Sequence, residues 1–374
     1  MTYEDTSMIE NNPFHPGERI FSLVPSQQSH SNKVAVQIDI MLSLLFALAV
    51  GVVAASARNA GNNLVVTRQD STNAGQIQQI DVTTGSVLAV ADPSFVFSFP
   101  HVEMTSDSNT GDVYVVTFPV DAPGPVLFQL DHDLNVTYTW KNVPYSFFDL
   151  QYSPQQETLY GIKVTTTYGR VLSNFTTNQA ADTVTATELY TLPYMWYVNA
   201  SSFDPSNSRY FALINNFPGF ENSTLDQQLI VADFSQNIAT TQPAVGLFPI
   251  DSQNMLVQFV TYSHSLKTLF CAGMTKKTST GEAHAEVAIM DQTSGTVTKR
   301  VFSKSATAVG PLMYVPNGPG RNQLTVYIQT AAQPVPVWEL WSLSVHSDAS
   351  VESTLVQTYS GSDFKFFAGA AVSY

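Results

Sequence analysis

Charged residues and cysteine are both scarce in this chain of 374 residues. Only 12% of the residues are Asp, Glu, Lys or Arg, against 44% hydrophobic and 11% aromatic. This balance excludes wholesale disorder and supplies enough apolar side chains for a large core. The single Cys271 excludes an intrachain disulfide, and because it follows Leu269 and Phe270 in a strand-like run, we interpret it as a buried small hydrophobe.

Basic residues are also few. The 16 Lys and Arg residues are outnumbered by 30 Asp and Glu residues, which gives a formal net charge of −14. The longest basic run is Lys276 and Lys277. The sequence therefore disfavours nucleic acid, or any other polyanion, as a partner.

Local catalytic signatures are missing as well. The chain has no G-x-S-x-G elbow, no H-E-x-x-H pair, no P-loop and no glycine-rich dinucleotide fingerprint after a strand. The five histidines that follow residue 57 show no metal-ligand spacing. The sequence assigns no catalytic residue and no organic cofactor, and it favours a role other than enzyme.

The N-terminal region divides into two parts. Residues 1–40 are polar and lack a sustained period, which is typical of a disordered leader or of a gene-model artefact. Residues 40–57 carry no charge and end in Ala-Ser-Ala, a signal-peptidase pattern. If synthesis begins at Met41, residues 41–57 are a signal peptide cleaved after Ala57. If it begins at Met1, the same stretch approaches the roughly 20 residues of a membrane-spanning signal-anchor.

Both alternatives place residues 58–374 outside the cytosol, as a secreted protein or as a single-pass membrane protein that contacts the membrane only through residues 40–57. Four N-x-Ser/Thr sequons agree with this location and are candidate glycosylation sites. They are Asn135, Asn174, Asn199 and Asn222.

A hairpin unit recurs along the chain. In DLQYSPQQETLYGIKV, from Asp149 to Val164, alternating apolar residues lead into and out of a polar turn at Ser153 and Pro154. Similar units begin at residues 101, 200, 259 and 311, and the C-terminal FAGAAVSY reads as a first strand without a successor. The anchor residues before the turns are Met104, Tyr152, Phe203, Tyr262, Tyr314 and Tyr374.

A second marker falls between these units. Asp stands four residues before Gly or Asn at Asp81, Asp131, Asp233 and Asp291, and looser matches occur at Asn174 to Asn178 and Ser344 to Asp348. The Asp accepts backbone N–H groups at the start of a turn, and the Gly or Asn tolerates the left-handed conformation that ends it. Six such hairpins interleave with six opening hairpins.

Each unit therefore comprises four strands, as in a blade of a β-propeller. The chain resembles the β-propeller superfamily across roughly residues 60–374, in the style of quinoprotein-like or YVTN-like repeats, and matches no subfamily motif. The expected fold is all-β, a single domain over residues 58–374 with six blades, or seven if one long unit hides a degenerate blade. The C-terminal strand is expected to close the ring by pairing with the N-terminal blade.

In such a fold the two hairpin turns of each blade lie on one face, which we call the hairpin-turn face. The loops from the second to the third strand, and from blade to blade, lie on the opposite, crossing-loop face. Aromatic residues gather in the blade-to-blade crossings, where they form either a binding surface for a protein or glycan or wedges between sheets. The candidate binding residues are Phe95, Phe97, Tyr145, Phe147, Tyr194, Trp196, Tyr197 and Phe364.

Polar residues near the starts of the first strands face the predicted central channel: His101, Glu103, Asp149, Gln151, Asn199, Ser201 and Gln258. Six-bladed lactonases, which resemble this chain in blade number, use a channel Ca²⁺ for hydrolysis. That resemblance implies a candidate metal site at His101, Asp149 and Asn199, and the alternative is a water-filled polar channel.

Two functions follow from these patterns. The first is a non-catalytic extracellular or cell-surface propeller that binds a protein or glycan through its crossing-loop face. The alternative is a secreted propeller hydrolase or lactonase with a divalent metal in the channel.

Overall fold

Contacts in the computed structural model divide the chain into two compact units, residues 1–58 and 59–374. All described residues belong to the second unit: 63–69, 75–91, 97–107, 109–119, 124–141, 143–144, 146–165, 169–192, 196–216, 226–235, 243–252, 254–276, 281–316, 322–331, 335–360 and 366–372. Every regular element among them is a β-strand. The predicted leader and apolar segment lie outside these ranges, and no helix among the described residues is long and apolar enough to cross a membrane.

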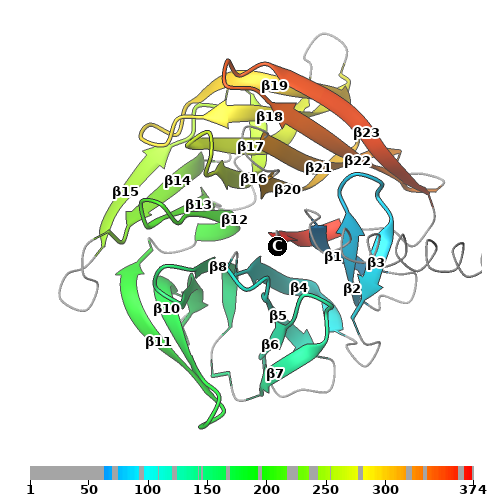
Figure 1. Ribbon diagram of the computed structural model, residues 1–374. Coiled ribbons are helices and arrows are strands. Elements are labelled where there is room, and N and C mark those ends of the chain that lie inside the picture. The colour runs from blue at the N-terminus through cyan, green and yellow to red at the C-terminus, as the bar shows by residue number, and fades with distance from the viewer. Residues whose placement is uncertain are drawn as a thin grey trace, which may run out of the picture. The chain divides into compact units, whose positions relative to one another are not determined.

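Six antiparallel sheets of four strands each form the ring seen in Figure 1, which confirms the six-bladed expectation and removes the need for a seventh blade. Blade 1 consists of β24 (Phe366–Val372), β1 (Asn63–Gln69), β2 (Gly75–Asp81) and β3 (Val87–Val90). Blade 2 consists of β4 (Phe97–Ser106), β5 (Val113–Pro119), β6 (Val126–Leu130) and β7 (Val136–Trp140). Blade 3 consists of β8 (Phe147–Ser153), β9 (Thr158–Val164), β10 (Arg170–Asn178) and β11 (Thr183–Thr191).

The remaining blades follow the same order. Blade 4 consists of β12 (Trp196–Asp204), β13 (Arg209–Asn216), β14 (Asp226–Asp233) and β15 (Ala244–Pro249). Blade 5 consists of β16 (Met255–Ser263), β17 (Thr268–Lys276), β18 (Ala283–Met290) and β19 (Val297–Ser305). Blade 6 consists of β20 (Ala308–Pro316), β21 (Asn322–Ala331), β22 (Val337–Val345) and β23 (Val351–Ser360). The first strands β4, β8, β12, β16, β20 and β24 lie innermost, around the central axis (Figure 1).

Ring closure occurs as the sequence predicts. The C-terminal strand β24 pairs antiparallel with β1, with Asn63 opposite Val372 and Val65 opposite Ala370. Blade 1 is therefore built from both ends of the folded unit. This pairing removes the open sheet edges that an unclosed array of blades would leave.

The core lies between the blades, where the anchor residues pack. Tyr152 of blade 3 stacks on Tyr114 of blade 2, with ring centroids 5.2 Å apart. Phe203 of blade 4 stacks in the same way on Tyr160 of blade 3, at 5.8 Å. Tyr262 of blade 5 stacks likewise on Phe211 of blade 4. Because these three anchor rings lie on the second strand of the preceding blade, the recurring aromatic position is a wedge between sheets.

One predicted anchor, Met104, needs correction, and another, Tyr374, lies outside the described residues. In blade 2, Ser106 pairs with Val113 across the first turn, at the same separation as Tyr152 and Leu159 in blade 3. The structural counterpart of Tyr152 is thus Ser106, two residues after the predicted Met104. Tyr374 lies outside the described part of the chain.

The second hairpins confirm the turn chemistry expected of the aspartates. Asp81 Oδ1 accepts the N–H groups of Thr83 and Thr84, at 2.7 and 3.0 Å, and Gly85 is left-handed with φ +69°. Asp131, Asp233 and Asp291 accept backbone N–H groups in the same way.

Three details of the second marker were predicted wrongly. In the turn of blade 2, the left-handed residue is Leu134 and not Asn135. Asn174 and Asn178 both lie within β10, so the looser match there was misplaced and the turn falls at residues 179–182. In blade 6, Asp348 is the residue that accepts a turn N–H, from Ser350 at 2.9 Å.

One irregularity recurs in every blade. Each pairing between a first strand and a second strand shifts register near the crossing-loop end, which marks a β-bulge or a similar defect. Bulges re-aim side chains and often lie beside functional sites. The bulges therefore place the residues at the axial starts of the first strands in conformations that regular pairing would not give.

Candidate functional site

Asp149 is the most unusual residue at the axis. It lies in the bulge of β8. Phe148 pairs with Ile162 of β9 and Gln151 pairs with Tyr160, so two residues of β8 stand opposite one residue of β9. Its φ is +55°, in the left-handed region that side-chain-bearing residues seldom adopt. The residue is also only 6% exposed. A strained conformation of this kind persists only where the surroundings hold it.

Two neighbouring strands hold the Asp149 backbone in place. The Asp149 carbonyl oxygen accepts a hydrogen bond from Ser201 Oγ of β12 at 2.8 Å and another from the Tyr210 hydroxyl of β13 at 3.0 Å. Gln151 Nε2 donates to the carbonyl oxygen and the hydroxyl of Ser201, at 3.2 and 3.1 Å. Blades 3 and 4 are therefore joined by polar contacts at this point of the ring.

Glu103 of β4 completes the site from blade 2. Its carboxylate accepts the backbone N–H of Asp149, and the side chain is half-buried. We call Glu103, Asp149, Gln151, Ser201 and Tyr210 the axial cluster. The cluster draws on three consecutive blades. Glu103, Asp149, Gln151 and Ser201 stand in the interior of the first strands β4, β8 and β12, and Tyr210 stands near the start of β13, beside the first hairpin turn of blade 4.

Both carboxylates of the axial cluster favour the protonated form. Burial raises the pKa of Glu103 to about 7, although the hydrogen bond from Asp149 opposes the rise. Burial also raises the pKa of Asp149 well above its usual range, and the charge of Glu103 adds to the effect. Strong desolvation together with a specific charged neighbour is a common property of functional carboxylates.

The Tyr210 hydroxyl belongs to the same electrostatic environment. Burial raises its pKa well above the usual range, and the charges of Asp149 and Glu103 act in the same direction, while a hydrogen bond with Ser201 opposes them. Tyr210 thus remains a neutral hydrogen-bond donor that fixes the backbone of Asp149.

Carboxylates on the hairpin-turn face are in a different state. Asp291 Oδ1 accepts hydrogen bonds from the backbone N–H and the hydroxyl of both Thr293 and Ser294, at 2.8 to 2.9 Å. These bonds hold the pKa of Asp291 below its ordinary value. Its acceptor capacity is used within the turn, as the sequence predicts for a turn-forming residue.

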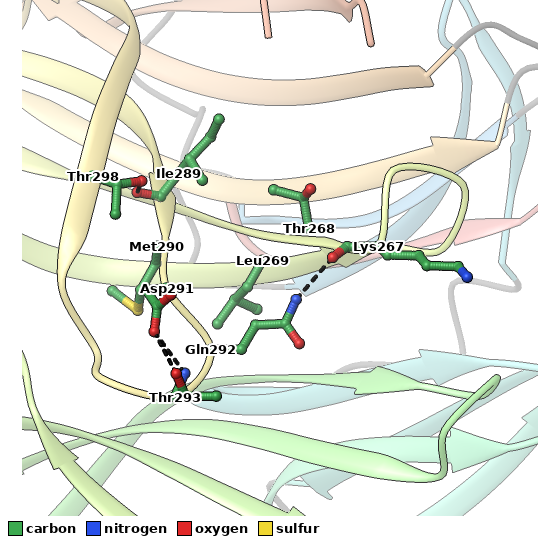
Figure 2. A pocket seen from close by; sticks show the side chains of 9 residues that line it. All are labelled: Lys267, Thr268, Leu269, Ile289, Met290, Asp291, Gln292, Thr293 and Thr298. Carbon is green, nitrogen blue, oxygen red and sulfur yellow. Dashed lines mark hydrogen bonds between the residues drawn. The ribbon is translucent and has the colours of Figure 1, made fainter. Parts of the chain in front are cut away.

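A hollow of about 330 Å³ lies on the same face, between the two hairpin turns of blade 5 (Figure 2). Gln292 Nε2 donates to the Lys267 carbonyl oxygen at 2.8 Å, which ties one turn to the other. Thr298 Oγ1 donates to the Ile289 carbonyl oxygen at 3.3 Å. The polar groups that line this hollow thus serve the turns themselves.

Hydroxyl groups of the anchor tyrosines bind aspartates of the preceding blade. Tyr152 hydrogen-bonds Asp107, and Tyr262 hydrogen-bonds Asp204. Asp107 and Asp204 also accept N–H groups within their own turns, from Asn109 and Ser206. These aspartates therefore fasten blade to blade and are accounted for structurally.

The described residues test only part of the predicted metal site. Asp149 lies in the axial cluster, whereas the side chains of His101 in β4 and Asn199 in β12 fall outside the described set. No group of three or more His, Cys, Asp or Glu side chains among the described residues is arranged to hold a metal ion. The trio of His101, Asp149 and Asn199 stays a prediction.

The predicted aromatic surface also remains a prediction. Phe97, Phe147, Trp196 and Tyr197 lie in described strands, but their side chains fall outside the described set, as do the whole residues Phe95, Tyr145, Tyr194 and Phe364.

The two sequons within the described residues differ in their surroundings. Asn135 is exposed beside a turn, whereas Asn174 lies in the middle of β10 and is only partly exposed. Asn222 and the side chain of Asn199 fall outside the described set. Glycosylation at any of the four stays a prediction.

Sequence reasoning named Glu103 as a channel residue but left it out of the metal trio, and it missed Tyr210. Glu103 could have been paired with Asp149, because both stand on first strands of neighbouring blades. No sequence pattern pointed to Tyr210, because its role depends on its hydrogen bond to the Asp149 carbonyl oxygen in the bulge of β8.

No protein-family model matches the chain, and no curated protein matches its sequence. Among solved structures, TolB from Acinetobacter baumannii is 14% identical, with a TM-score of 0.50 over 84% of this chain and 67% of that one. A chain of a nidogen–laminin complex is 9% identical, with a TM-score of 0.50 over 83% of this chain and 98% of that one. The chain is a six-bladed β-propeller. At these identities the likeness shows the fold alone, and the propeller's function must come from its own residues.

Proposed function

We propose that the propeller is a non-catalytic binding protein, secreted or held at the cell surface, that takes a protein or glycan ligand at its crossing-loop face. The observation that carries this proposal is the state of Asp149. It combines a left-handed backbone with near-complete burial, in the bulge of an innermost strand. Such strain combined with desolvation in an innermost strand supports a binding role there.

The contrast between the hairpin turns and the axial cluster supports a site away from the turns. On the hairpin-turn face, Asp81, Asp131 and Asp291 use their carboxylates to accept turn N–H groups. In the axial cluster, the bonds made by Asp149 come from its backbone, and its carboxylate accepts none from the described residues. Among the described residues, the Asp149 carboxylate is thus not used by a turn, unlike the aspartates of the hairpin-turn face.

The location rests on sequence. The uncharged segment 40–57, its Ala-Ser-Ala ending and the exposed sequon at Asn135 support entry into the secretory pathway.

A ligand screen with paired variants tests this proposal. The purified protein is applied to glycan and extracellular-protein arrays beside Trp196→Ala and Asp149→Asn, with Asp291→Asn as the control on the opposite face. We expect at least one ligand that binds the wild-type protein and Asp291→Asn but does not bind Trp196→Ala, Asp149→Asn or both. A ligand lost only with Asp291→Asn would overturn the assignment of the face.

A propeller hydrolase with a divalent metal at the axis is the second candidate. The observation that favours it is the placement of Glu103 and Asp149, two carboxylates on neighbouring innermost strands. Carboxylate oxygens are ligands that Ca²⁺ prefers. Hydrolysis of a lactone and ester panel that requires Ca²⁺ and disappears in Glu103→Gln would favour this candidate over the first.

A further inference from the structure

The axial cluster holds a buried carboxyl group, Asp149, to which the described residues offer no positive partner. Asp149 is 6% exposed, and its carboxylate accepts no hydrogen bond from any residue that the structure describes. The hydrogen bonds of Asp149 are made by its N–H, to Glu103, and by its carbonyl oxygen, from Ser201 and Tyr210. A carboxylate removed from water is stable in its charged form only when paired.

The neighbouring groups that the structure describes do not provide that pairing. From β4 comes Glu103, whose charge repels that of Asp149. From β8 and β12 come the neutral Gln151 and Ser201, which bond each other. From β13 comes Tyr210, whose hydroxyl feels the negative charge of both carboxylates. Each of these contacts is neutral or acidic, so the cluster is complementary to a positive group.

The arrangement suits a planar organic cation. Glu103 and Asp149 stand on the neighbouring strands β4 and β8, and their carboxyl groups are close enough to interact electrostatically. An arginine guanidinium presents five N–H donors in a rigid fork and bonds carboxylates in pairs. Glu103 is only half-buried, so the pair is accessible from solvent on that side. The net charge of −14 also favours the approach of a basic partner.

We propose that the axial cluster binds a basic side chain, in particular an arginine guanidinium, that a partner protein presents at the axis of the ring. This inference rests on the proposed binding function and narrows it to a protein ligand with an exposed basic residue. Glu103 and Asp149 bind the cation, whereas Ser201, Tyr210 and Gln151 position the Asp149 backbone.

Isothermal titration of the protein with the peptide Ac-Gly-Arg-Gly-NH₂ tests the inference, and the same peptide with neutral citrulline is the matched control. We expect the arginine peptide to bind and the citrulline peptide to bind at least about tenfold more weakly. Glu103→Gln and Asp149→Asn should each lower the affinity about tenfold or more, a factor that corresponds to about 1.4 kcal/mol. Asp291→Asn, in a turn on the opposite face, should leave the affinity unchanged.

A second measurement uses the wild-type protein only, so it does not depend on how the variants fold. Because the cation needs the charged form of the pair, binding at pH 6.5 should release protons, and the affinity should rise from pH 5 to pH 8. Proton release is read from the dependence of the binding heat on the ionisation heat of the buffer. Equal affinity for the arginine and citrulline peptides, or an affinity independent of pH, would overturn the inference.

Two further outcomes separate this inference from the proposed function. In the first, CaCl₂ alone binds the wild-type protein, loses this binding in Glu103→Gln and displaces the arginine peptide. In that case the cluster binds a metal ion, and the proposal of a basic side chain is wrong. If an array ligand loses binding in Trp196→Ala but keeps it in Glu103→Gln and Asp149→Asn, the binding face stands and the cation inference falls.

Discussion

Replacing Glu103 by Gln gives the sharpest stability prediction. The pKa of Glu103 rises from its ordinary value of 4.5 to about 7 in the folded protein, so the folded state keeps a proton that the unfolded chain loses between these pH values. The wild-type protein should therefore lose stability as pH rises from 4.5 to 7. At about 1.4 kcal/mol per pKa unit, the loss is on the order of 2–3 kcal/mol, the lower figure allowing for solvent at this half-buried side chain.

The variant removes the titration and keeps the contact. The Gln amide oxygen can still accept the N–H of Asp149, and the side chain carries no charge at any pH. We expect Glu103→Gln to match the wild type within about 1 kcal/mol at pH 5 and to be more stable at pH 8. Urea unfolding at pH 5, 6, 7 and 8, with EDTA present and tryptophan fluorescence as the signal, measures both free-energy profiles.

A matched control uses the exposed Glu352 of β23, whose replacement by Gln should leave the wild-type profile unchanged. The reasoning is refuted if the profiles of wild type and Glu103→Gln run parallel from pH 5 to pH 8. It is also refuted if the wild-type protein gains stability on passing from pH 5 to pH 7 while Glu103→Gln does not.

Four further predictions concern the scaffold and the N-terminus. Gly273→Ala should destabilise by at least about 3 kcal/mol, because its Cβ would lie 2.1 Å from the Leu256 carbonyl oxygen; urea unfolding or loss of soluble protein measures this. Asp291→Ala should cost only about 1 kcal/mol in the same assay, since its bonds are exposed. Cys271 is fully buried and burial raises its pKa to about 12, so a thiol reagent should modify it only after unfolding. N-terminal mapping should find Arg58 if residues 41–57 are cleaved, and an intact Met1 would instead support the anchor.

The fold could be predicted because its signals are local. Alternation in the hairpin units and the Asp-to-Gly spacing each depend on a few neighbouring residues. The error in blade 2 has the same origin. Met104 and Ser106 are two residues apart and share a face of the strand, so alternation could not choose between them, and the turn that begins at Asp107 sets the register.

The axial cluster could be predicted only in part, because it depends on contacts between blades. Alternation does not reveal the extra residue that makes Asp149 left-handed, nor the bonds that Ser201 and Tyr210 make to its carbonyl oxygen. Sequence position suggested that Asp149 faced the axis. It could not show that Glu103 lies against it, because that contact follows from the packing of β4 beside β8.

Glu103 and Asp149 carry the proposed binding function, and the titration of both carboxyl groups can be observed directly. Carboxyl carbons of Asp and Glu are labelled with ¹³C, the signals of Glu103 and Asp149 are assigned through Glu103→Gln and Asp149→Asn, and both are followed from pH 3 to pH 9. We predict that Glu103 titrates with a midpoint near 7 and Asp149 well above the usual range of an aspartate. Midpoints near 4 for both groups, as in ordinary exposed carboxylates, would contradict the account.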